Sequence, residues 1–187
     1  MEKNELNTNA SFLLSLPTMH DNNFRSSIVY IHKHSGDGAN GWVINKELEQ
    51  RVASKLRKTI QLGVVCPIYY GGPVDVTQVY VLHSADKHIA NNTITLNENL
   101  CMTRDKMMIN MLNNNQFPKF WRVMVGSCSW GAGQLESELL GSRTGGRSMW
   151  NILPYCKDLM WNINPQQQWD HGIKKIATMM TKSYLNF

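Results

Sequence analysis

The stretch Ser27-Ile-Val-Tyr-Ile-His-Lys-His34 is rich in β-branched and aromatic residues, a composition that predicts a central strand of a sheet. A glycine-rich segment, Gly36-Asp-Gly-Ala-Asn-Gly41, follows and is expected to form a loop. The apolar segment Trp42–Asn45 then predicts a returning strand. Together the three segments favour a β-hairpin.

The rest of the chain predicts a mixture of strands and helices. Apolar residues at Leu48, Val52, Leu56 and Ile60 recur every four residues, which indicates an amphipathic helix. Further strands are expected at 11–16, 67–70, 78–83, 92–96, 120–126 and 149–153, and further helices at 103–113 with Thr103 as N-cap, at 134–140, and from Pro165 to near the end. Because the strands cluster instead of alternating with helices, we expect an α+β fold.

Length and charge bound the organisation of the chain. Its 187 residues suit one domain, which we expect over 11–187, after a frayed N-terminal segment at 1–10. Nineteen Lys and Arg face fourteen Asp and Glu, a net charge of +5. This mild excess permits nucleic-acid binding but does not require it.

The N-terminal segment and the cysteines indicate a cytoplasmic protein with no membrane association. Glu2 and Glu5 stand where a signal peptide has basic residues, and no apolar run reaches the length of a membrane span. The four cysteines match no zinc-binding spacing. We expect free thiols in a reducing compartment, with no metal and no cofactor.

Three short motifs have a functional and a structural interpretation. Gly36-x-Gly38-x-x-Gly41 matches the dinucleotide fingerprint as a string, but a strand follows it where the fingerprint needs a helix, so a hairpin loop is favoured. Cys128, within Gly126-Ser-Cys-Ser-Trp130, is better explained as a buried thiol than as a nucleophile. His32 and His34 lie on one face of their strand and could bind a metal with His20 or His83, or be satisfied by polar contacts.

Two groups of basic side chains form a possible nucleic-acid surface. Arg51, Lys55 and Lys58 fall on one face of the expected helix at 48–60, and Arg143 and Arg147 lie in a glycine-rich loop. A solvated helix face and a tolerated loop insertion are the alternatives.

Three segments in order resemble the YqgE/AlgH family. The first runs from Leu16-Pro-Thr-Met-His-Asp-Asn-Asn-Phe24 to Val43-Ile-Asn-Lys46, the second is Tyr70-Gly-Gly-Pro-Val74 followed by Leu82-His83, and the third is Trp130-Gly-Ala-Gly-Gln-Leu-Glu136 with Glu138 after it. The resemblance covers about residues 11 to 175. The chain departs from the family pattern at Ser127-Cys-Ser129 and in an insertion at Gly141–Ser148.

The resemblance implies an α+β fold with a bifurcated, mostly antiparallel sheet that curls into a pseudo-barrel flanked by helices. It does not imply an enzyme. Some family members are given a regulatory role in transcription, so we expect a non-enzymatic regulatory or binding protein that acts through nucleic acid or a protein partner. A monomer or weak homo-oligomer is expected.

The matching motifs also define a candidate binding patch of polar and aromatic side chains. Asp21 is expected to cap a turn, and Arg25 to pair with a carboxylate such as Glu136. If they converge, the patch could serve a small ligand or a hydrolase-like reaction using Asp21, His34, His83 and Glu136. The alternative is that these side chains tie loops to an irregular sheet. Its members are Asp21, Phe24, Arg25, His34, Asn45, Gly71, Gly72, Pro73, His83, Trp130, Gln134 and Glu136.

Overall fold

The computed structural model describes residues 8–89, 91–142 and 145–185, and these form two compact units. Unit 1 comprises Met1–Asn45 and Cys128–Phe187, and unit 2 comprises Lys46–Ser127. The prediction of one domain over 11–187 stays a prediction, because two compact units can belong to a single domain.

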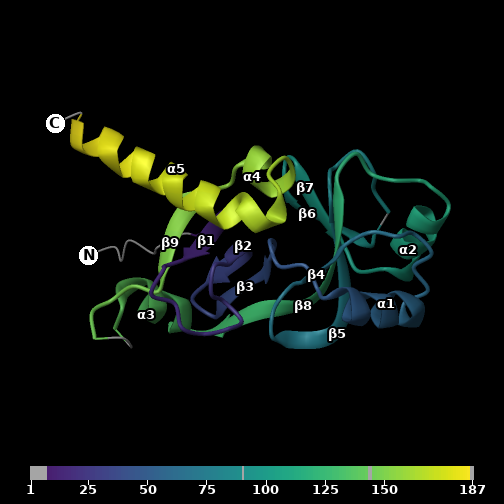
Figure 1. Cartoon of the computed structure of the whole chain (residues 1–187), viewed down its shortest axis with the longest axis horizontal. Coiled ribbons are helices and arrows are strands. Elements are labelled where there is room, and N and C mark those ends of the chain that lie inside the picture. Colours follow the sequence, from purple (N-terminus) through teal and green to yellow (C-terminus); the bar gives the residue numbers. More distant parts are fainter. Residues whose placement is uncertain (1–7, 90, 143–144, 186–187) are drawn as a thin grey trace. The chain divides into compact units, whose positions relative to one another are not determined.

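Unit 1 is built on an antiparallel sheet (Figure 1). The order β9-β1-β2-β3 continues into the second part of β8, with every pair antiparallel. The strands are β1 (Ser11–Ser15), β2 (Ile28–Ser35), β3 (Gly38–Val43), β8 (Trp121–Gly131) and β9 (Trp150–Pro154), and the helices are α3 (Gln134–Leu140), α4 (Lys157–Trp161) and α5 (Pro165–Leu185).

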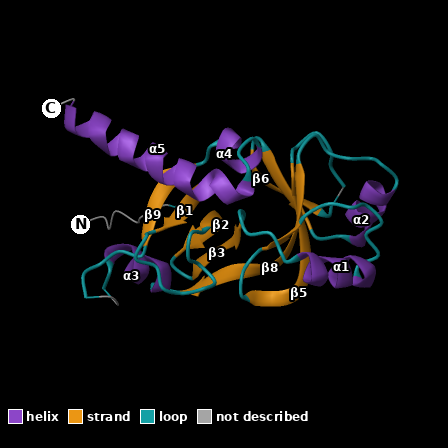
Figure 2. Ribbon diagram, viewed as in Figure 1, coloured by secondary structure: helices purple, strands orange, loops and turns teal. Residues whose placement is uncertain are grey.

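Unit 2 holds the remaining strands and the short helices α1 and α2, which are labelled in Figure 2. The order β6-β7-β5 leads to the first part of β8, which pairs with β5 on one side and with β4 on the other. Only the β4–β8 pairing is parallel among those of the described residues. The elements are α1 (Gln50–Thr59), β4 (Ile68–Tyr70), β5 (Val74–His83), β6 (Thr93–Asn97), β7 (Leu100–Thr103) and α2 (Lys106–Asn113).

Strand β8 is the point at which the sheet forks. Its residues 121–127 pair within unit 2, while 128–131 pair with β3 of unit 1. This confirms the predicted α+β class with a bifurcated, mostly antiparallel sheet, and the β2–β3 register confirms the predicted hairpin.

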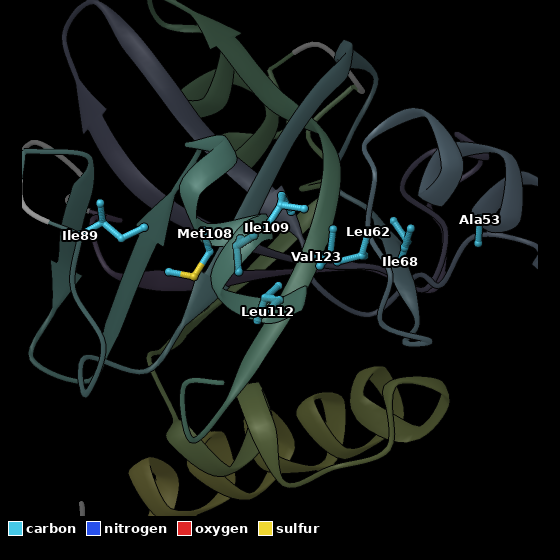
Figure 3. Packing of buried hydrophobic residues seen from close by; sticks show 9 residues of the cluster. Ala53, Leu62, Ile68, Ile89, Met108, Ile109, Leu112 and Val123 are labelled. Atoms are coloured by element: carbon cyan, nitrogen blue, oxygen red, sulfur yellow. The ribbon is translucent and has the colours of Figure 1, made fainter. Parts of the chain in front are cut away.

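Each unit buries its own apolar residues. In unit 1, consecutive residues of β1, Phe12, Leu13 and Leu14, are fully buried, as expected for a strand covered on both faces. Helix α5 packs on β1, where the Nε1–H of Trp169 donates to the carbonyl oxygen of Ser15 at 2.9 Å. In unit 2, the buried cluster of Figure 3 joins α1, α2, β4, β5 and β8. Each fully buried Leu, Ile, Val or Met side chain stabilises the fold by about 1.5–3 kcal/mol.

Three local predictions were wrong. Strand β3 begins at Gly38, inside the expected loop, because this glycine-rich segment pairs with both β2 and β8. Thr103 ends the unpredicted strand β7 and is not an N-cap; instead Asp105 Oδ1 accepts the N–H of Met107 at 2.6 Å. Helix α4 was also missed, because five residues are too few to show periodicity.

The predictions on the cysteines and the membrane can be compared directly with the structure. All four cysteines are free thiols, as predicted, and Cys128 is buried in β8. None of the helices described is both long enough and apolar enough to cross a membrane.

Candidate functional site

The predicted binding patch is divided between the two units. Gly71, Gly72, Pro73 and His83 belong to unit 2, and the other members belong to unit 1. Each group is therefore a separate candidate.

In unit 1, the carboxylate of Glu138 on α3 gathers three donors. Its Oε2 accepts the indole N–H of Trp130 at 3.0 Å and that of Trp150 at 2.8 Å. Its Oε1 accepts the amide of Gln134 at 3.1 Å, one helical turn earlier. Neither Glu138 nor Trp150 was in the predicted patch. The i, i+4 spacing of Gln134 and Glu138 could have indicated their contact, but nothing local indicates the two tryptophans.

The aromatic rings around this carboxylate pack against one another. Phe24 lies 6.3 Å from Trp130 and 5.4 Å from Trp150, and the two tryptophans are 6.2 Å apart, all between ring centroids. These separations are those of directly packed aromatic pairs, so the rings fill the space between them. Trp130 and Trp150 are buried. The cluster therefore ties α3 to β8, β9 and the turn before β2, and this favours a structural role for Phe24, Trp130 and Gln134.

His34 is held by residues on both sides of its ring. Its Nδ1 lies 2.9 Å from Thr8 Oγ1, and its Nε2 lies 3.3 Å from Glu136 Oε1 without hydrogen-bond alignment. The His34 side chain is only 5% exposed, against 34% for Glu136. The predicted pairing of Arg25 with Glu136 is wrong, because the carboxylate lies against His34 and Arg25 is exposed with no ion pair among the described residues.

Asp21 and Asn45 support the backbone of unit 1. Asp21 Oδ1 accepts the N–H of Asn23 at 2.7 Å, which confirms the predicted turn cap. Asn45 Oδ1 accepts the N–H of Ile28 at 2.8 Å, and its Nδ2 donates to the carbonyl of Ser26 at 2.9 Å. Both side chains are thus used in holding the entry to β2.

In unit 2, the Gly-Gly-Pro segment allows a close approach of two backbones. A Cβ on Gly71 would lie 2.2 Å from the carbonyl oxygen of Gly126 in β8. Gly126 has φ +77°, and a Cβ there would lie 2.3 Å from the oxygen of Gly72. The predicted close approach is confirmed, and the partner is the chain's own strand. Pro73 follows on the exposed side.

His83 is fully buried at the end of β5. Its Nδ1 lies 2.9 Å from the carbonyl oxygen of Ser84, and its Nε2 lies 2.9 Å from Thr103 Oγ1. Burial lowers the pKa of His83, which favours the neutral ring. Both ring nitrogens are therefore used within unit 2.

The histidines expected to share a strand face have different contacts. A register shift interrupts β2 between Ile31 and Lys33. His32 stacks on Trp42 at 4.7 Å, whereas His34 binds Thr8. Across the described ranges there is no group of three or more His, Cys, Asp or Glu side chains placed to hold a metal ion.

The predicted nucleic-acid contacts on α1 are all exposed. Arg51, Lys55 and Lys58 lie at i, i+4 and i+7 and point to solvent. Arg147 is exposed as well, in unit 1, and Arg143 lies outside the described residues. Unit 2 contains ten Lys and Arg against six Asp and Glu, so it carries +4 of the net charge of +5.

The chain matches a known protein family over most of its length. The sequence profile of the AlgH-like family, DUF179, matches residues 12–181. A UPF0301 protein of Shewanella baltica is 30% identical over 174 residues, 89% of each chain. UPF0301 proteins of Erwinia tasmaniensis and Vibrio cholerae are each 27% identical over 181 residues, 92% of this chain and 93% of theirs.

Two solved structures share the fold. The solution structure of the AlgH protein from Pseudomonas aeruginosa superposes with a TM-score of 0.73 at 24% identity, over 97% of this chain and 96% of that one. The crystal structure of a Corynebacterium diphtheriae protein gives a TM-score of 0.67 at 18% identity, over 94% and 90%.

Proposed function

The chain belongs to the AlgH-like family, and we propose that it is a non-enzymatic regulatory binding protein whose unit 2 binds nucleic acid through the exposed basic face of α1. The observation that carries this proposal is the concentration of charge: unit 2 holds +4 of the +5, and α1 presents Arg51, Lys55 and Lys58 side by side. Nucleic-acid affinity without a base-reading motif depends on such phosphate contacts.

The three cations are available for phosphates. None has a carboxylate within 4.0 Å among the described residues. Glu47, which could have neutralised them, accepts a hydrogen bond from the hydroxyl of Tyr69 at 3.3 Å. Arg57 and Lys58 lie in the last turn of α1, where the helix dipole favours cations.

A hollow adjoins this face and would extend the contact. It has a volume of about 470 Å³ and is lined by Ser54, Arg57, Lys58, Gln61, Leu62 and Gly63, all within unit 2. Arg57 donates through one terminal nitrogen to the carbonyl of Cys66, while its Nε is buried and makes no hydrogen bond among the described residues. The exposed side chain of Lys58, which lines the hollow, would meet a phosphate there.

The candidate acid–base groups are buried or already engaged in contacts within the fold, and this supports the non-enzymatic part of the proposal. His83 is fully buried with both nitrogens bonded, and Asp21 caps a turn. His34 is nearly inaccessible. Acid–base catalysis needs such a group within hydrogen-bond reach of a substrate.

The proposal is tested by fluorescence anisotropy with labelled duplex and single-stranded DNA at about 50 and about 200 mM salt. The variant Arg51→Gln/Lys55→Gln/Lys58→Gln is compared with a control of equal charge change in unit 1, Lys33→Gln/Lys174→Gln/Lys182→Gln, whose three residues are exposed. We expect binding that weakens with salt, and a salt slope reduced by up to about 2.7 in the α1 variant only, about 0.9 per lost phosphate contact.

Two outcomes contradict the proposal. The first is no binding at low salt, which leaves a protein partner as the target of a regulatory role. The second is an equal loss in both variants, which indicates that net charge and not the α1 face governs binding.

A further inference from the structure

Unit 2 contains a second pocket, of about 320 Å³, which none of the predicted site residues lines. It lies where the end of α1, the middle of β5 and the connection from β7 to α2 meet. All its lining residues lie between Thr59 and Ile109, so unit 2 forms it alone. Its volume falls at the lower end of the range for small-molecule sites.

One part of the pocket wall is apolar and fixed in place. Val81 and Ile109 line the pocket and are members of the buried cluster shown in Figure 3. Ile60 and Val79 also line it and pack partly against the same cluster. The pocket floor is thus the outer side of a packed core, which holds its shape.

Another part of the wall is cationic. Arg104 and Lys106 line the pocket, both are exposed, and neither has a carboxylate within 4.0 Å in the part of unit 2 that the structure describes. Asp105 stands between them, but its Oδ1 accepts the N–H of Met107 and its Oδ2 accepts the amide of Asn92 at 2.5 Å. Both oxygens face neutral donors and the carboxylate keeps its charge, so Arg104, Asp105 and Lys106 together leave this part of the wall with a net charge of +1.

Neutral polar groups complete the wall. Thr59, Thr77 and Gln78 come from α1 and β5. Thr103 is committed to the interior, because its Oγ1 binds His83 at 2.9 Å and Thr93 at 2.7 Å. These hydrogen bonds hold the end of β7 in place, directly before Arg104 and Lys106.

We propose that this pocket is a binding site for a small amphiphilic anion, with an apolar body on Ile60, Val79, Val81 and Ile109 and a carboxylate or similar head group between Arg104 and Lys106. An apolar floor with a few convergent polar groups is the usual composition of a ligand site. Because Arg104 and Lys106 are both positively charged, the head group is expected to be negatively charged. This site uses none of Arg51, Lys55 and Lys58, and it shares only Gln61 with the hollow beside α1.

The test is an NMR titration of the ¹⁵N-labelled full chain with three matched probes: 4-phenylbutanoate, 4-phenylbutanol and 4-phenylbutylamine. We expect saturable shifts of the amide signals of Gln61, Gln78 and Ile109 with the carboxylate, weaker shifts with the alcohol and none with the amine. The variant Arg104→Gln/Lys106→Gln is expected to weaken carboxylate binding about tenfold or more, because it removes the charged donors that would bind the carboxylate.

Two further variants make the test specific. Thr77→Trp places a bulky side chain at an exposed lining position and is expected to abolish binding without removing charge. Lys55→Gln/Lys58→Gln removes two charges from α1 and is expected to leave carboxylate binding unchanged. The proposal is overturned if no pocket signal shifts, if the amine binds as well as the carboxylate, or if Arg104→Gln/Lys106→Gln has no larger effect than the α1 variant.

Discussion

The Nε2 of His83 lies 2.9 Å from the Oγ1 of Thr103, and this contact fixes the direction of a buried hydrogen-bond relay in unit 2. The carbonyl of Ser84 can only accept, so Nδ1 of His83 carries the hydrogen and Nε2 of the neutral ring accepts. Thr103 then donates to His83, and Thr93 donates to Thr103 while accepting the N–H of Ile89 at 2.9 Å. The relay links β5, β6 and β7.

This relay predicts that the protein is destabilised by mild acid. In the folded state, burial lowers the pKa of His83 below its ordinary value of 6.5. At a pH between the folded and unfolded pKa values, the unfolded chain therefore binds more protons than the folded chain. The stabilising contribution is therefore complete above about pH 6.5 and is lost as the pH falls below it. Urea unfolding at several pH values between about 5 and 8 measures this dependence.

His83→Gln provides the comparison, because glutamine can still accept from Thr103 but does not titrate in this range. The variant is expected to show a flatter pH dependence than the parent. His32, whose pKa burial also lowers, contributes with the same sign, so a residual slope is expected. A variant that keeps the full slope would show that His83 does not carry it.

The carboxylate of Glu138 is predicted to be the main polar support of α3 in unit 1. Glu138→Gln replaces one of the two acceptor oxygens by a donor, which must face either the two indole N–H groups or the amide of Gln134, and is expected to cost about 2–4 kcal/mol of unfolding free energy. Near-ultraviolet circular dichroism should change as well, because Trp130 and Trp150 no longer donate to a carboxylate. Denaturant unfolding gives the free energy.

Glu136→Gln is the matched control on the same helix. Glu136 is partly exposed, lies against His34 and accepts no hydrogen bond among the described residues, so its substitution breaks no hydrogen bond and is expected to cost less than about 1 kcal/mol. Equal costs for the two variants would contradict the central place given to Glu138.

Gly126 is predicted to be the glycine of unit 2 that tolerates substitution least. Gly126→Ala combines a left-handed φ of +77° with a Cβ 2.3 Å from the carbonyl oxygen of Gly72, a backbone atom that cannot rotate away. The expected loss is about 3 kcal/mol or more. Gly133, with φ +70° and nothing within 4 Å of its Cβ, isolates the conformational cost, and Gly133→Ala should lose about 1–2 kcal/mol. Thermal unfolding of both variants measures the difference, and equal losses would exclude the backbone clash.

Several features could be predicted from the sequence because they are local. The residues of β2 and the returning segment before Asn45 identified the hairpin, and the four-residue spacing in 48–60 identified α1 and the exposure of Arg51, Lys55 and Lys58. Periodicity reports which side of one element is apolar. It fails where an element is short or where pairing partners lie far apart, as with Gly38 in β3 and Thr103 at the end of β7.

The sequence by itself therefore determined the α+β class, the hairpin, the family and the basic face of α1. Only the tertiary structure decided that the predicted patch is divided between two units, that Glu138 joins Trp130 to Trp150, and that Thr103 binds His83 across 20 residues. The same holds for the pocket between Ile60 and Lys106. These relationships follow from strand order and register, and no local pattern of residues encodes which strands become neighbours.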